Sequence, residues 1–375
     1  MQVTGTLQRE AWRRGELPPT EQVTSGVWSV PVPIPDNPLR YVLSYAIEHA
    51  SGFVLLDPGW DDPASWQALT DGLAACSVPL DAITAVLITH MHPDHHGLSG
   101  AVREKSGAWI GMHEREDELL ARFARPALRS AGAAYLRWCG APEEHIGQIA
   151  GTRRPGGMSA MARADRLLAD NALVDVPGLR LRAVWTPGHS PGHLCFHDET
   201  HGLLLTGDHV LPRITPNVSA YDMDSEPLDE YLDSLDKLNG IEPREVLPAH
   251  EYRFAGLGSR LDGLRDHHAE RLGEALAILR AHDAGQDGVS QHGVSQHGVG
   301  QHGVSQHGAG QSAWQMATQV SWSRRWDQLS TFQHQAALGE VVAHLRYLRS
   351  RGTVTCAEVG GVGLWRPSAG KAPSG

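Results

Sequence analysis

Residues 89–97, THMHPDHHG, concentrate four histidines and one aspartate directly after the apolar run AVLI. The neutral imidazole is the commonest metal ligand in proteins, and a hydrophobic core seldom needs several adjacent imidazole rings. Residues two apart in an extended turn point the same way, so His90 and His92 can share one ion. Asp94 and His95 then face a second ion. The segment therefore predicts a metal site.

Three further candidate ligands follow apolar segments elsewhere in the chain. They are His189 in TPGHSPGH, Asp208 in TGDH and His250 in LPAHEY. The whole set offers three imidazoles for one ion, an aspartate and two imidazoles for another, and one carboxylate to share. Nitrogen and oxygen ligands without thiolate suit Zn²⁺, Mn²⁺ or iron. The four cysteines lie far apart without a CxxC pair, so we expect neither a thiolate site nor a disulfide framework.

The elements that must position these residues follow from two sequence patterns. Short runs rich in β-branched and aromatic residues predict strands at 27–34, 41–48, 53–59, 85–90, 179–189, 193–197, 202–209 and 244–250. Residues 65–77 instead carry apolar side chains at helical spacing, at Trp66, Leu69, Leu73 and Ala74. Alternation of strands and helices predicts a layered α/β fold, in which loops at the strand ends converge and bind ligands.

The remaining sequence predicts additions to a catalytic domain over residues 1–255. Residues 114–168 are rich in Arg and Ala and poor in β-branched residues, which predicts a helical insertion. Residues 288–312 repeat the pentapeptide GVSQH, a composition too small and polar to offset the entropy of ordering its backbone. We therefore expect a flexible tether over 284–312 and a disordered tail over 367–375.

A small C-terminal module is expected over residues 256–366, with the tether interrupting it. Helical patterns at 261–282, 314–322 and 337–352 precede the hairpin-like segment 353–366. Three helices and a hairpin outline a winged helix.

The motif HMHPDH, residues 90–95, matches the HxHxDH signature of the metallo-β-lactamase superfamily. TPGHS, TGDH and PAHE resemble its third, fourth and fifth motifs in the expected order, so the resemblance covers residues 25–255. The segment ITPNVS, residues 214–219, and the winged-helix outline are similar to the branch with β-lactamase-like protein 2 and hydroxyacylglutathione hydrolase-like proteins. The GVSQH repeat departs from that pattern. The resemblance implies a four-layer αββα sandwich with a small C-terminal domain.

The resemblance also implies a role for each ligand. The first ion would be bound by His90, His92 and His189, the second by Asp94, His95 and His250, and both by Asp208. Two divalent ions about 3.5–4 Å apart can hold a hydroxide and polarise an electrophile, and we expect Zn²⁺ at both positions. Asp94 would also accept a hydrogen bond from this hydroxide, and Asp208 would be catalytic by keeping the pair together. His193 would donate a proton or a hydrogen bond to the substrate.

The expected function is hydrolysis of a thioester, lactone or other ester of a small molecule. The alternative is cleavage of single-stranded RNA, favoured by seven basic against three acidic residues from Ala313 onward, by the winged-helix outline and by His193. A third candidate is a persulfide dioxygenase with one iron, which would keep many of the same residues. Two residues are candidate walls of the substrate site, Tyr221 and Trp138.

Composition limits the partners and the location. The chain of 375 residues has 32 Lys and Arg against 43 Asp and Glu, so its net charge of −11 argues against binding polyanions over its whole surface. Its N-terminal segment, MQVTGTLQREAWRRGELPP, has no apolar core of signal-peptide length, and no apolar run reaches the length of a membrane span. We therefore expect a cytoplasmic protein without membrane contact.

Overall fold

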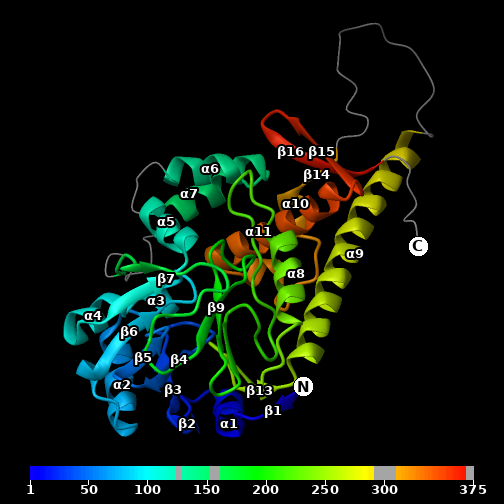
Figure 1. Cartoon of the computed structure of the whole chain (residues 1–375). Coiled ribbons are helices and arrows are strands. Elements are labelled where there is room, and N and C mark those ends of the chain that lie inside the picture. The colour runs from blue at the N-terminus through cyan, green and yellow to red at the C-terminus, as the bar shows by residue number, and fades with distance from the viewer. Residues whose placement is uncertain (124–127, 152–160, 291–309, 369–375) are drawn as a thin grey trace, which may run out of the picture. The chain divides into compact units, whose positions relative to one another are not determined.

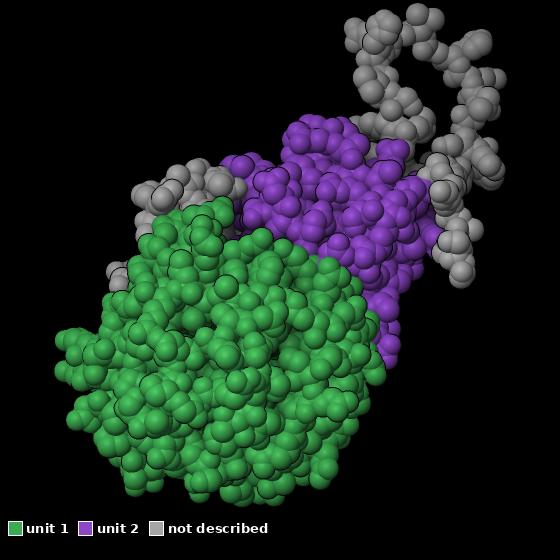
Figure 2. Space-filling view, in the orientation of Figure 1, with its two compact units in different colours: residues 1–126, 153–216, 230–265 green, residues 127–152, 217–229, 266–375 purple. Residues whose placement is uncertain are grey.

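The computed structural model describes residues 1–123, 128–151, 161–290 and 310–368. The chain divides into two compact units, which Figure 2 shows in different colours. The first unit comprises residues 1–126, 153–216 and 230–265, and the second comprises residues 127–152, 217–229 and 266–375. The predicted boundary near residue 255 therefore does not divide the chain into these units, because residues 127–152 and 217–229 also belong to the second unit.

The larger of two sheets in the first unit has the strand order β2-β3-β4-β5-β6-β7-β8 (Figure 1). Its strands are β2 (Glu21–Thr24), β3 (Val27–Pro33), β4 (Tyr41–His49), β5 (Gly52–Leu56), β6 (Ile83–Leu87), β7 (Trp109–Met112) and β8 (Arg166–Leu167). Neighbours from β2 to β5 pair antiparallel, and those from β5 to β8 pair parallel. Parallel pairs need crossover connections, and α2 (Pro63–Ala75) and α4 (Ser99–Ser106) lie in two of them.

The smaller sheet has the order β1-β13-β12-β11-β10-β9. Its strands are β1 (Gln2–Val3), β13 (Phe254–Ala255), β12 (Glu245–Pro248), β11 (Leu203–Gly207), β10 (Leu194–Asp198) and β9 (Leu181–Trp185). Only β11 and β12 pair parallel among these strands, and α8 (Pro227–Leu238) lies in the connection between them. Helix α1 (Thr6–Arg14) follows β1.

Alternation along β4 shows how the layers form. Tyr41, Leu43 and Tyr45 belong to an apolar core that also contains residues of the smaller sheet, so this core lies between the two sheets. Val42 and Ala46 point to the opposite face, where they pack in a second core with buried residues of α2 and α4. With α8 on the smaller sheet, where Ser234 Oγ donates to Pro187 O, the predicted αββα sandwich is confirmed.

The second unit contains helices and a small sheet. Its helices include α6 (Leu128–Trp138), α7 (Glu143–Gly151), most of α9 (Leu257–Ser290), α10 (Ala313–Ala317) and α11 (Thr331–Ser350). Its sheet has the order β14-β16-β15, with β14 (Gln311–Ser312), β15 (Val354–Val359) and β16 (Val362–Pro367). The winged-helix interpretation of this unit stays a prediction.

The insertion and the tether differ in detail from expectation. The segment 114–168 contains α5 (Glu114–Phe123), α6, α7 and β8, and its residues 124–127 and 152–160 lie outside the described residues. The predicted tether is too long at both ends, because α9 continues to Ser290 and β14 begins at Gln311. A helix already formed extends easily, since each added residue gains a hydrogen bond without a new nucleus. Residues 291–309 lie outside the described residues, as do 369–375 of the predicted tail.

None of the helices in the described part of the chain has the length and apolar character needed to cross a membrane.

Candidate metal centre

Every predicted ligand lies just after a strand of the first unit. His90 and His92 follow β6, and the short helix α3 (Pro93–His96) then carries Asp94 and His95. Pro93 occupies the first position of this helix, where its fixed φ angle favours helix initiation. The remaining ligands follow three strands of the smaller sheet: His189 after β9, Asp208 after β11 and His250 after β12. The strand ends thus bring distant parts of the chain together.

The first group contains three imidazoles. His90 Nε2 lies 2.8 Å from His92 Nδ1, and His189 Nε2 lies 3.3 Å and 3.2 Å from these two atoms. Burial lowers the pKa of His92 to about 3 and, with the neighbouring imidazoles, lowers the pKa of His90 well below its usual value. Each nitrogen of a neutral imidazole is either a donor or an acceptor, so at least one of these three pairs brings two like atoms together. A cation that accepts the lone pairs would remove this conflict, so the group fits a metal ion.

The second group contains Asp94, His95 and His250. Asp94 Oδ2 lies 3.7 Å from His95 Nε2 and 3.4 Å from His250 Nε2. Burial opposes protonation of His250, but the adjacent Asp208 and Asp94 outweigh it and raise its pKa to about 10. The buried atoms His95 Nε2 and His250 Nε2 have no hydrogen-bond partner in the described part of the chain. The two carboxylates therefore favour a positive charge at this place. The two nitrogen atoms without hydrogen-bond partners could bind a metal ion that carries this charge.

Asp208 lies between the two groups. Its Oδ2 atom is 3.7 Å from His189 Nε2, and its Oδ1 atom is 3.5 Å from His95 Nε2 and 3.2 Å from His250 Nε2. Each carboxylate oxygen therefore faces a different group, as a bridging ligand requires. The structure brings all seven predicted metal ligands together as two groups, one with three histidines and Asp208 and one with Asp94, His95 and His250.

Asp57 orients two of the ligands and was not predicted from the sequence. Its Oδ2 atom lies 2.8 Å from His95 Nδ1 and accepts a 2.7 Å hydrogen bond from Thr89 Oγ1. Thr89 Oγ1 in turn lies 3.0 Å from His90 Nδ1. A carboxylate that accepts one ring N–H fixes the tautomer and leaves the other nitrogen to the metal. The only signal in the sequence was the position of Asp57 in the predicted strand 53–59.

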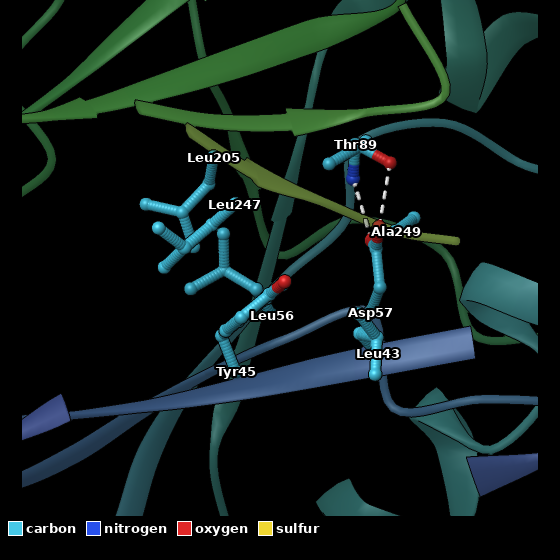
Figure 3. Close-up of a pocket in the computed structure, with 9 residues that line it drawn as sticks. Leu43, Tyr45, Leu56, Asp57, Thr89, Leu205, Leu247 and Ala249 are labelled. Atoms are coloured by element: carbon cyan, nitrogen blue, oxygen red, sulfur yellow. Dashed lines mark hydrogen bonds between the residues drawn. The ribbon is translucent and has the colours of Figure 1, made fainter. Parts of the chain in front are cut away.

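Figure 3 shows Asp57 and Thr89 beside a cavity between the two sheets, lined otherwise mostly by apolar residues such as Leu43 and Leu205. Its volume is about 10 Å³. A cavity of that volume accommodates at most about one water molecule, so a substrate cannot bind there.

His250 is oriented by the backbone. Its Nδ1 atom donates a 2.8 Å hydrogen bond to Tyr41 O, and Tyr41 Oη donates to Glu251 O at 2.7 Å. These bonds connect β4 of the larger sheet to the segment after β12 of the smaller sheet. The packing of the two sheets therefore directs the Nε2 atom of His250 to the other candidate metal ligands.

His193 occupies a different position from the one predicted for a group that contacts substrate. Its side chain is fully buried, and its ring lies 5.2 Å from the ring of His90. Its Nδ1 atom contacts Thr186 Oγ1 at 2.9 Å, and its Nε2 atom accepts a 3.3 Å hydrogen bond from the backbone N–H of Asp208. With both ring nitrogens engaged, His193 supports Asp208 from behind the ligands and has no free proton donor for a substrate.

The two candidate wall residues belong to the second unit. Trp138 packs on its core, with its ring 6.1 Å from that of Trp365, so its contacts are those of a packing residue. Tyr221 is 48% exposed and its hydroxyl donates to Asn217 Oδ1 at 3.2 Å. A role for Tyr221 at the substrate stays a prediction.

Two packed sheets with helices outside them, and two groups of metal ligands at their strand ends, define a metal-binding hydrolase of the αββα class. The sequence matches the Metallo-beta-lactamase superfamily over residues 37–250. The chain belongs to that superfamily, which confirms the resemblance seen in its motifs.

Part of the chain is similar in sequence to curated proteins. Lactamase-like protein adaB of Aspergillus niger is 28% identical over 268 residues, which are 70% of this chain and 67% of that protein. Probable metallo-hydrolase YqjP of Bacillus subtilis is 26% identical over 242 residues, or 60% of this chain and 72% of YqjP. The atrochrysone carboxyl ACP thioesterase of Aspergillus fumigatus is 30% identical over 210 residues, or 56% of this chain and 49% of the thioesterase.

Solved structures resemble nearly the whole chain. A metallo-beta-lactamase family protein of Thermus thermophilus has a TM-score of 0.70 and 28% identity, and the match covers 92% of this chain and 100% of that one. A beta-lactamase domain protein of Burkholderia ambifaria has a TM-score of 0.71 and 26% identity, with 93% of each chain covered. The likeness therefore extends beyond the residues that match the superfamily.

Proposed function

We propose that this protein is a hydrolase with two divalent metal ions, Zn²⁺ by preference, that cleaves a thioester of a small or carrier-bound acyl group. The position of Asp208 between two complete ligand groups carries the proposal, because its two oxygens face different groups. A mononuclear iron dioxygenase would need only one of these groups, so the second group favours the binuclear alternative.

The chain's own residues would hold and orient this centre. His90, His92 and His189 would hold the first ion, Asp94, His95 and His250 would hold the second, and Asp208 would contact both. When bound, such a pair of ions supplies a hydroxide nucleophile at neutral pH and polarises the electrophile. Asp94 would accept a hydrogen bond from the nucleophile and transfer a proton to the leaving group. Asp57, Tyr41 O and His193 would keep the ligands oriented.

Attack on the carbonyl of an acyl thioester is favoured over cleavage of a phosphodiester by three observations. One relative is an atrochrysone carboxyl ACP thioesterase, which supports an acyl thioester as the substrate class. The net charge of −11 opposes attraction of a polyanion such as RNA. His193, which was part of the argument for RNA cleavage, lies buried behind Asp208.

A two-substrate assay tests the proposal. Protein purified without a His-tag and loaded with zinc is assayed against a panel of acyl thioesters of glutathione, pantetheine and acyl carrier protein. A labelled single-stranded RNA is assayed in parallel at two salt concentrations. We expect thioester cleavage that requires metal; RNA cleavage that falls steeply with salt, without thioester turnover, would overturn the proposal.

Metal analysis of the same protein tests the ion count. We expect two ions per chain. The repeat histidines His292, His297, His302 and His307 could bind additional ions. A variant that lacks residues 291–309 should therefore keep both ions and full thioester turnover.

A further inference from the structure

Glu116 is a fully buried carboxylate on α5 that lies outside both groups of metal ligands. Its Oε2 atom accepts a 2.8 Å hydrogen bond from Met91 N. Its Oε1 atom accepts hydrogen bonds from Ser190 Oγ at 2.8 Å and from Gly192 N at 2.6 Å. One side chain thus connects two loops that lie about a hundred positions apart in the sequence.

Both loops carry ligands of the same group. Met91 lies between His90 and His92, and Ser190 directly follows His189. Glu116 therefore binds one loop at the residue between His90 and His92, and the other loop at the residue that follows His189 and at Gly192. We propose that Glu116 is a positioning residue that fixes the His90–His92 loop relative to the His189 loop, and so sets the affinity of the three-histidine group for its ion.

The chemistry of the three donors requires a carboxylate at this position. Each oxygen of Glu116 accepts from a backbone N–H, of Met91 or of Gly192, and a backbone N–H cannot become an acceptor. A glutamine would turn its NH₂ group toward one of these two N–H groups. Glu116→Gln therefore releases one loop, whichever way the amide is oriented.

The loop that carries His189 approaches Glu116 closely at Gly192. A Cβ atom added to Gly192 would lie 2.7 Å from Glu116 N and 2.9 Å from Glu116 Cγ, so no larger residue fits without displacement. Within the loop, the backbone N–H groups of Gly188 and His193 both donate to Ser190 O. The loop is compact, and a shift of Ser190 would be transmitted to His189.

Paired ligand backgrounds isolate this role from general destabilisation. In His250→Ala, the second group loses a ligand and the three-histidine group keeps all its imidazoles. In His189→Ala, the three-histidine group loses a ligand and the second group stays complete. Glu116→Gln is placed in each background, and zinc affinity is measured by competition with a chelator. Loss of a partner that orients metal ligands typically lowers metal affinity about 10- to 100-fold. We expect that loss in the His250→Ala background and no change in the His189→Ala background.

Two further variants keep the test decisive. Ser190→Ala removes one of the three hydrogen bonds and leaves the carboxylate in place, so it tests the proposal even if Glu116→Gln folds poorly. It should lower zinc affinity by a smaller factor in the His250→Ala background and leave it unchanged in the His189→Ala background. Asp198→Asn alters a buried carboxylate of β10 that accepts from Thr200 and His201, and should change neither affinity.

An equal loss in both backgrounds would show a general structural role and overturn the proposal, as would unchanged affinity in both. The inference depends on metal binding and not on the bond that is hydrolysed. Failure of the thioester assay would therefore leave it intact, and its own failure would leave the thioester proposal intact.

Discussion

Asp57 Oδ2 and His95 Nδ1 lie 2.8 Å apart, although 38 positions separate the two residues in the sequence. The aspartate follows β5 and the histidine lies on α3 after β6, and these two strands pair parallel. Parallel pairing brings the ends of β5 and β6 together at one edge of the sheet. The contact is therefore a consequence of the sheet, and it directs His95 Nε2 to Asp94 and Asp208.

Asp57→Asn should weaken metal binding by the group that contains His95. The amide can no longer accept from Thr89 N, Thr89 Oγ1 and His95 Nδ1 together, so the imidazole loses its fixed orientation. We expect a loss of about 10- to 100-fold in zinc affinity, measured by competition with a chelator. Asp62→Asn, at the exposed N-cap of α2, is the control and should leave the affinity unchanged. Unchanged affinity in Asp57→Asn would remove Asp57 from the account of the site.

Asp208→Ala should remove more than one contact. The substitution takes a carboxylate oxygen from each group and leaves the Nε2 atoms of His95 and His250 beside one carboxylate, that of Asp94. We expect less than two ions per chain by elemental analysis and a loss of hydrolysis of about 100-fold or more. Asp236→Ala, on the exposed face of α8, should keep both ions and full activity. Two ions with full activity in Asp208→Ala would contradict the bridging role.

The buried pair His268 and His344 should make the second unit sensitive to acid. His344 Nδ1 donates to Glu340 O at 2.7 Å, so its Nε2 atom accepts from His268 Nδ1 at 3.2 Å. Burial lowers the pKa of His344 to about 4 and that of His268 to about 2, the latter also through the adjacent His344. Both rings are therefore neutral in the folded protein at neutral pH.

The sign of the effect follows from the depressed pKa. Between about pH 6.5 and pH 4 the unfolded chain binds a proton at His344 and the folded chain does not. The free energy of unfolding therefore decreases as the pH is lowered through this range. His344 alone should contribute a loss of roughly 3 kcal/mol over that range. Urea unfolding at several pH values should show a flatter profile for His344→Gln than for the unaltered chain. His282→Gln, farther along α9, is the control, and identical slopes in all three proteins would refute the prediction.

Arg346→Met should destabilise the segment 217–229. The buried guanidinium of Arg346 donates to Asp222 O and to Ser225 O, both at 2.6 Å. Methionine fills similar space but leaves both carbonyls without these donors, at a cost of about 2–4 kcal/mol in the free energy of unfolding. Faster proteolysis within 217–229 should accompany the loss.

Arg349→Met on the same helix is the matched control. Its side chain is half-exposed and forms a 3.5 Å ion pair with Glu226, which typically contributes less than about 1 kcal/mol. Equal effects of the two substitutions would show that burial and backbone contacts of Arg346 do not matter.

The sequence by itself determined most of the strands, because short runs of β-branched and aromatic residues indicate buried strands, as in β4, where the first seven residues are all buried. It also indicated the candidate ligands that the structure brings together, because metal ligation needs particular residue types at particular spacings, and the motifs around His90, His189 and His250 contain both. It did not determine the end of α9 at Ser290, because the stability of a helix depends on the turns already formed as well as on local composition.

Only the tertiary structure decided what surrounds the ligands. Asp57 and Glu116 are ordinary acidic residues in the sequence, and each becomes a positioning group only because sheet pairing and loop packing bring distant backbone and imidazole N–H groups to it. His193 has the residue type of a proton donor, but burial behind Asp208 gives it a supporting position. Residue type is local information, whereas burial and hydrogen-bond partners arise from contacts between parts of the chain that only folding brings together.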